Sequence, residues 1–260
     1  MRLDATTVRR LLIVLLIVAW EVLPQAGLVP RLFLPPVSAT VAALWGSAPE
    51  YAYHLWVTLQ EVAISMLFAC VGGVAAGLVI GNSVRLRQLL LPLASAGFAI
   101  PLVILYPLFT AWFGIGPESK IVFASVYGFL PTLLGTAAGV QTIDRHLVTV
   151  ARSLGASRFQ QITRVFLPAA IPTVLSSLRI GGALVIVGVT VAEMLTSTAG
   201  IGFLISRYRT LLDSPHVFAA ILLVLAMAIA FDWLVQLIER RVAGWQRAIR
   251  TEQAPAAAYS

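Results

Sequence analysis

A polar segment at residues 149–168 carries the side chains best suited to recognising a partner. Its sequence, TVARSLGASRFQQITRVFLP, contains Arg152, Arg158 and Arg164 and lies between two long apolar runs. Guanidinium groups form bidentate hydrogen bonds with carboxylates, so this cluster suits contact with an acidic surface. A chain that only reverses direction between two apolar elements needs a few residues. The extra length therefore predicts a docking site for a soluble partner.

The local sequence predicts that this segment folds as a hairpin of two short helices. Residues 147–154 form the first helix, and Gly155 lets the backbone turn where a side chain would obstruct it. Ser157 and Gln160 have the spacing of a capping box, so a second helix can start at Arg158. The alternative is that the arginines only anchor the segment at anionic headgroups, at about 1 kcal/mol each. Anchoring leaves the length and the glycine turn unexplained, so we assign it a minor, simultaneous role.

The chain around this segment is too apolar for an ordinary soluble domain. It is 59% hydrophobic and 11% charged, with a mean hydropathy of +0.92. Several uncharged runs approach or exceed the roughly 20 residues that cross a bilayer as a helix. Helices satisfy their own backbone hydrogen bonds in lipid, so an all-α polytopic membrane protein is expected. About six transmembrane helices are predicted, at residues 10–25, 56–82, 89–113, 121–141, 171–195 and 218–238.

The distribution of basic residues predicts the orientation of these helices. If six helices alternate across the membrane, thirteen arginines lie on one side and four basic residues lie on the other. This asymmetry places both termini and the 149–168 segment in the cytoplasm. The net charge of +7 therefore follows from membrane topology and does not indicate nucleic-acid binding.

Two charged residues fall inside predicted membrane helices. Arg179 lies about ten residues into the fifth helix, and Asp232 lies near the inner end of the sixth. Central charges cost about 2.5–3.5 kcal/mol on insertion scales, so both should face protein or water. Their similar depth predicts an ion pair between the two helices, with a solute site as the alternative.

Other polar or kinked positions are candidates for a translocation pathway. Pro101 and Pro107 kink the third helix and free backbone carbonyls, while the Tyr106 hydroxyl can line a cavity. Glu193, followed by Met194, lies near the outer end of the fifth helix. It could belong to a gate or to a docking surface, and a solvated interfacial carboxylate accounts for it equally well.

The remaining residues predict neither catalysis nor a metal site. The histidines are scattered without metal-ligand spacing, Cys70 is a packing residue within an apolar run, and no polar catalytic cluster or P-loop is present. Glu61, Glu118 and Lys120 are interpreted as interfacial. These residues therefore do not predict an enzyme.

The polar segment resembles the EAA loop of ABC importer permeases, which has the form E-A-A-x3-G-x9-I-x-L-P. The corresponding positions are Thr149, Val150, Ala151, Gly155, Val165, Leu167 and Pro168. Four of them match, Val165 replaces Ile, and Thr149 and Val150 replace the first Glu and Ala. By this resemblance Leu154, Gly155 and Ala156 form the knob that fits a groove on an ATPase. The coupling site so implied consists of Ala151, Arg152, Leu154, Gly155, Ala156, Ser157, Arg158, Phe159 and Pro168.

Further blocks from Leu34 to Trp245 resemble permeases of the nitrate, sulfonate, taurine and bicarbonate type. They include Leu34-Pro35-Pro36, Trp112-Phe113-Gly114-Ile115-Gly116 and Gly200-Ile201-Gly202. The resemblance implies a type I importer fold with a cytoplasmic coupling-helix hairpin in the bacterial inner membrane. The implied divisions are a first membrane helix (1–28), a periplasmic segment (29–55), a core permease domain (56–245, with the coupling loop at 142–168) and a cytoplasmic tail (246–260).

The resemblance also implies the partners. These are a second copy of the chain, two cytoplasmic ATPases that hold ATP and Mg²⁺, and a periplasmic or lipid-anchored solute-binding protein; the chain itself would hold no cofactor. The expected solute is small and anionic or polar. Import of a heterocyclic vitamin precursor by the same machinery is the alternative. A stand-alone secondary transporter would predict repeated halves and buried ion-coupling carboxylates, which the sequence does not suggest.

Overall fold

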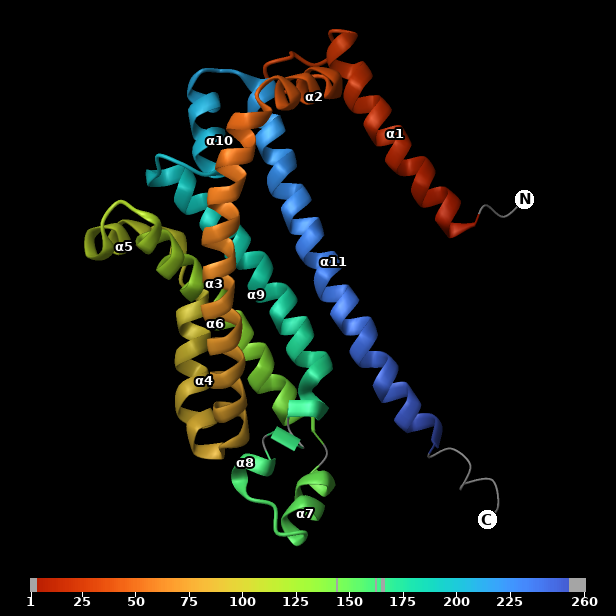
Figure 1. The fold of residues 1–260 in the computed structure, drawn as a ribbon, viewed down its shortest axis with the longest axis vertical. Helices are drawn as coiled ribbons and strands as arrows, with labels where there is room; N and C mark the ends of the chain where they lie inside the picture. Colours follow the sequence, from red (N-terminus) through yellow and green to blue (C-terminus); the bar gives the residue numbers. More distant parts are fainter. Residues whose placement is uncertain (1–3, 144, 162, 165–166, 253–260) are drawn as a thin grey trace. The chain divides into compact units, whose positions relative to one another are not determined.

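The described part of the chain folds into helices joined by short turns (Figure 1). This computed structural model describes residues 4–143, 145–161, 163–164 and 167–252, and within these residues no strand occurs. The helices are α1 (Ala5–Gln25), α2 (Val37–Gly46), α3 (Ala48–Asn82), α4 (Val84–Ala99), η1 (Leu102–Leu105), α5 (Tyr106–Phe113), α6 (Pro117–Gln141), α7 (Arg145–Ser153), α8 (Arg158–Gln161), α9 (Leu167–Thr196), α10 (Ile201–Thr210) and α11 (Ser214–Glu252).

Within the described residues, four helices are long and apolar enough to cross a membrane, and a bent pair makes up to five candidate spans. The four are α3, α6, α9 and α11, and the pair is α4 with the η1–α5 segment. The predicted all-α, polytopic membrane fold is therefore confirmed. The first predicted span coincides with α1, which is helical but is not among these candidates and carries Arg9, Arg10 and Glu21.

The prediction of one continuous third helix at residues 89–113 was wrong. In place of one kinked helix at 89–113, α4 and the η1–α5 segment meet at an angle of 81°. The break falls at Ile100, whose backbone is extended (φ −71°, ψ 131°), immediately before Pro101. A proline ring disfavours the helical conformation of the preceding residue, which accounts for the break at this position. Pro92 lies inside α4, and Pro107 lies in the first turn of α5.

Close helix packing explains the glycines of α3. A Cβ atom added at Gly73 or Gly77 would lie 2.7 or 2.6 Å from the Cβ of Thr132 or Thr136 on α6. At Gly81 it would lie 2.8 Å from the Cβ of Val140. The three glycines thus follow one line along α6, where their lack of a side chain lets the two helices approach closely.

The chain divides into two compact units, each with its own interior. The first comprises Met1–Gln60 and Thr190–Ala226, and the second comprises Glu61–Val189 and Met227–Ser260. In the first unit Tyr51 of α3, Ile201 and Leu204 of α10, and Ala219 and Ala220 of α11 are buried together. In the second unit α6 is contacted by α4 and α5, and its glycines receive side chains of α9.

Candidate functional site

The turn between α7 and α8 is fixed by backbone hydrogen bonds that require a glycine-like conformation. Gly155 has a φ of +78°. Its N–H donates to the carbonyl of Arg152 at 2.9 Å, and the N–H of Ala156 donates to the carbonyl of Ala151 at 3.0 Å. This pair of bonds is the Schellman motif, which satisfies the last carbonyls of α7. The predicted glycine turn is confirmed.

The start of α8 is fixed by the two side chains that the sequence pattern indicated. The Gln160 N–H donates to the Ser157 hydroxyl at 3.3 Å, and the Ser157 N–H donates to Gln160 Oε1 at 2.8 Å. The predicted capping box is therefore confirmed, and α8 begins at Arg158. The Gln161 side chain donates to the carbonyl of Ala156 at 2.9 Å, which ties α8 back to the turn. Leu167 and Pro168 are the first two residues of α9, and Val165 lies outside the described residues.

The hairpin of α7 and α8 exposes apolar side chains at its turn. Leu154 is 82% exposed and Phe159 is 74% exposed. The flanking Arg152 is exposed, whereas Ala151 and Ala156 are half-buried. Two large apolar side chains beside a cation form a small surface whose burial would favour association with another protein. Figure 1 shows the two helices next to one another at this hairpin.

Glu193 is buried, so its interpretation as a solvated interfacial carboxylate was wrong. Only 1% of the residue is exposed. Its Oε1 accepts the Thr58 hydroxyl at 2.8 Å, and its Oε2 accepts the Gly202 N–H at 2.7 Å. Met194 is half-buried, and its carbonyl accepts the Ser206 hydroxyl at 2.8 Å. Both residues therefore belong to the packed interior of the first unit.

Two residues interpreted as interfacial form a buried ion pair. The Lys120 ammonium on α6 contacts a carboxylate oxygen of Glu61 on α3, and each side chain is 5% exposed. Glu118 is exposed, as expected for an interfacial residue. A pair of opposite charges satisfies the need for compensation in a low-dielectric interior, which explains why both can be buried.

Tyr106 lies within an aromatic cluster of the second unit. Its side chain is buried, and its ring meets the Phe123 ring edge-on with centroids 5.1 Å apart. Phe109 also meets Phe123 edge-on, at 5.6 Å. The tyrosine therefore packs against rings in this conformation, and its role in a pathway remains a prediction.

Comparison with known proteins assigns the chain to a family. Residues 70–244 match the family described as "Binding-protein-dependent transport system inner membrane component". The chain belongs to this family. The resemblance to ABC importer permeases is therefore confirmed. The chain is a multi-pass membrane subunit of a transport system.

The permease is similar to proteins named for several transport systems. It is 31% identical to the putative aliphatic sulfonates transport permease protein SsuC of Bacillus subtilis, over 91% of this chain and 86% of that one. It is 29% identical to the taurine transport system permease protein TauC of Escherichia coli, over 88% and 86% of the two chains. A chain of the MetNI methionine ABC transporter in an inward-facing conformation has the same fold, with a TM-score of 0.68, 19% identity and coverage of 76% and 98%.

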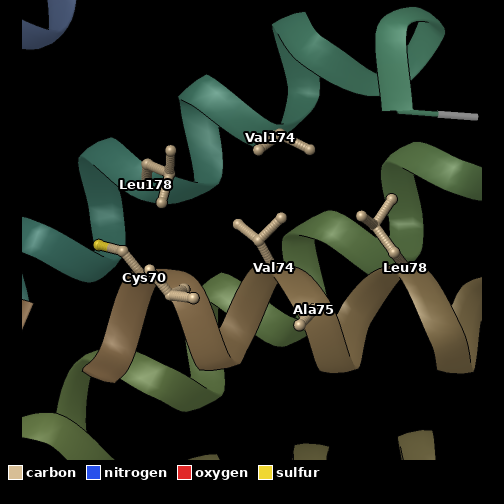
Figure 2. A pocket seen from close by; sticks show the side chains of 7 residues that line it. Cys70, Val74, Ala75, Leu78, Val174 and Leu178 are labelled. Atoms are coloured by element: carbon tan, nitrogen blue, oxygen red, sulfur yellow. The ribbon is translucent and has the colours of Figure 1, made fainter. Parts of the chain in front are cut away.

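An open surface pocket in the second unit of the permease is entirely apolar. Its volume is about 420 Å³, and Figure 2 shows its walls formed by side chains of α3 and α9. The lining residues are Cys70, Val71, Val74, Ala75, Leu78, Val174 and Leu178. No polar surface lines it, so it offers a polar solute no hydrogen bond. Among the described residues, no group of three His, Cys, Asp or Glu side chains could hold a metal ion.

Arg179 of the permease contacts its predicted partner and a second carboxylate. Its Nε lies 2.9 Å from Asp232 Oδ1, and its Nη2 donates to Glu239 Oε2 at 3.1 Å. Gln236 donates to the other Asp232 oxygen at 2.6 Å, so the carboxylate is held from two sides. The three charged side chains are partly exposed in the single chain.

We expect Arg179→Met to destabilise the permease more than Asp232→Asn does. The first change leaves two carboxylates without their cation, whereas the second leaves Arg179 paired with Glu239. Adding Asp232→Asn to Arg179→Met should restore part of the loss. The check is the thermal unfolding midpoint of the wild type and the three variants in detergent. Additive losses would show that the two residues act independently.

Proposed function

We propose that this permease forms the translocation pathway of an ATP-driven importer and is coupled to the ATPase through the 149–168 loop. The observation that carries the proposal is the rigid turn that presents Leu154 and Phe159 to solvent. A Schellman motif and a capping box fix the backbone that carries these side chains, so little backbone ordering entropy is lost on docking. The residues proposed to couple the permease to the ATPase are Ala151, Arg152, Leu154, Gly155, Ala156, Ser157, Arg158, Phe159 and Pro168.

The partners follow from the family and from the loop. ATP and Mg²⁺ would be held by a separate ATPase subunit, because the sequence carries no P-loop. We infer a complex of two permease copies, two ATPase subunits and an external solute-binding protein. The permease itself would need no cofactor. Its hairpin would dock on the ATPase, with Arg152 and Arg158 facing acidic groups of that subunit.

We propose a small anionic or polar solute of the sulfonate, taurine or nitrate class. Relatives named for these solutes support it, including the nitrate import permease protein NrtB of Leptolyngbya laminosa, at 32% identity. A heterocyclic vitamin or its precursor is the second candidate. The formylaminopyrimidine permease ThiX of Halalkalibacterium halodurans and the riboflavin permease RibX of Chloroflexus aurantiacus, at 27% and 35% identity, support that alternative.

The test of the function is association followed by solute binding. An ATPase subunit should co-purify with the permease in mild detergent. The purified solute-binding partner should bind a sulfonate or nitrate by calorimetry. Binding of only a pyrimidine or flavin would select the alternative. A permease that purifies without an ATPase and still transports a solute would contradict the proposal.

We expect six spans with both termini cytoplasmic, with α1 as the first span. Reporter fusions at Ser47, Pro117 and Thr198 should be external, and those at Ser83, Ser157 and Glu252 should be cytoplasmic. Each position lies at a helix end or in a turn, so a fusion there interrupts no helix interior. We expect this orientation because basic residues are concentrated on the cytoplasmic side of membrane proteins, and thirteen of them would lie there. An external reporter at Ser157 would remove the basis for coupling through the hairpin.

A further inference from the structure

The turn that enters α10 directs three consecutive backbone N–H groups to side chains of other helices. The Gly200 N–H donates to Nδ1 of His54 at 2.9 Å, and the Ile201 N–H donates to the Thr58 hydroxyl at 2.8 Å. The Gly202 N–H donates to Glu193 Oε2 at 2.7 Å. The first groups of a helix have no partner within it, so these side chains cap α10 from outside.

The acceptors are themselves linked and buried. Thr58, which accepts from Ile201, donates its own hydroxyl proton to Glu193 Oε1 at 2.8 Å. His54, Thr58 and Glu193 are each less than one-tenth exposed. Both carboxylate oxygens accept hydrogen bonds, which is the pattern of an ionised group. A negative charge at the start of α10 is also stabilised by the helix dipole.

The backbone is shaped around the Glu193 carboxylate. Gly200 has a φ of +108°, and a Cβ atom there would overlap the carboxyl group of Glu193. At Gly202 a Cβ atom would overlap the carbonyl of Thr190. The two glycines thus allow the turn to close over the buried carboxylate. A side chain at either position would force it away.

A second connection joins α3 to the other end of α10. The Tyr208 hydroxyl donates to Glu50 Oε2, and Arg207 Nη1 donates to Glu50 Oε1, each at 2.6 Å. Burial, followed by the hydrogen bond to Glu50, raises the pKa of Tyr208 to about 12, so the phenol stays protonated as a donor. This connection is partly exposed, in contrast to the buried one.

We propose that Glu193, Thr58 and His54 form a latch that holds α10 against α3 and that releases during the transport cycle. The inference rests on the proposed function, in which the turn before α10 lies on the external side of the membrane and faces the solute-binding protein. Apolar side chains would hold two helices together permanently without the cost of burying a charge. A buried carboxylate at this contact therefore favours a role beyond static packing. A buried carboxylate held by two removable donors, the Thr58 hydroxyl and the Gly202 N–H, has two favourable states. It is hydrogen-bonded when the turn is closed and hydrated when the turn is open.

The test measures the separation of α3 and α10 in the complete transporter. Spin labels are placed on cysteines at the exposed positions Trp56 and Arg209, in a Cys70→Ala background, and the complex is reconstituted with its ATPase. The wild type should show one label distance without nucleotide and a second distance after trapping with ATP and vanadate. Glu193→Gln should populate the second distance without nucleotide, by at least about tenfold, because a charge-assisted hydrogen bond is lost.

Thr58→Val provides a second variant of nearly unchanged shape, should Glu193→Gln fail to assemble, and should have the same effect. Glu118→Gln is the matched control, since it removes an exposed carboxylate and should leave the wild-type distances unchanged. A single distance in every nucleotide state, in proteoliposomes that still import solute, would overturn the latch and leave the proposed function intact. Unchanged distances in both Glu193→Gln and Thr58→Val would also overturn it.

Discussion

Replacing Lys120 by methionine is expected to destabilise the permease by about 3–5 kcal/mol. The change removes the ammonium that compensates the Glu61 carboxylate, and both side chains are 5% exposed. The carboxylate then stays in the interior without its cation, or it pulls water between α3 and α6. The measurement is the free energy of unfolding in detergent, with the thermal midpoint as a second readout.

The double variant Glu61→Gln/Lys120→Met separates this cause from lost packing. It removes both charges and keeps similar side-chain volumes, so it should recover most of the stability that Lys120→Met loses. Glu118→Gln, two residues from Lys120 on α6 but exposed, should change stability little. A double variant as unstable as Lys120→Met would mean that the charge pair is not the cause.

Substitution of Gly155 by valine is expected to separate ATP hydrolysis from transport. At a φ of +78°, a β-branched residue costs about 1–3 kcal/mol, and the turn relieves this strain by changing its backbone. A Cβ atom would meet no other atom within 4 Å, so the strain is conformational and not a clash. The shift displaces Leu154 and the start of α8, so less of the ATPase should co-purify, and the ATPase that stays bound should hydrolyse ATP without stimulation by the solute.

Gly114→Val is the matched control for that substitution. Gly114 also has a positive φ, of +79°, and open surroundings, but it lies in the turn between α5 and α6. With a ψ of 176° it lies in a region that is essentially restricted to glycine, so valine there is also strained, at a place where no coupling is proposed. Retention of the ATPase by Gly155→Val, or its equal loss in Gly114→Val, would count against a specific role of the hairpin.

The hairpin could be predicted from sequence because its interactions are local. Ser157 and Gln160 are three residues apart, and Gly155 needs only its own φ and the preceding helix to form the turn. The glycines of α3, at four-residue spacing on one helix face, favour close approach of a neighbouring helix, but the sequence did not indicate that this helix is α6. Such signals depend on spacing within one element.

The buried charges could not be predicted because their partners are distant in sequence. Glu61 and Lys120 lie on different helices, and nothing in their spacing indicates that α3 and α6 bring them together. The same holds for Glu193, whose partners come from α3 and from the turn before α10. The prolines of the third apolar run predicted kinks, but the sequence did not indicate that the helix breaks before Pro101 and continues through Pro92.

The most direct test of the account measures ATP turnover and solute uptake in the same proteoliposomes, with the solute-binding protein and a bound solute present. For the wild type, ATP turnover should rise with the loaded binding protein and be accompanied by uptake. For Gly155→Val the account predicts that the permease inserts, that uptake is lost and that the solute no longer stimulates ATP turnover. Wild-type uptake and wild-type stimulation in Gly155→Val would contradict coupling through the 149–168 hairpin.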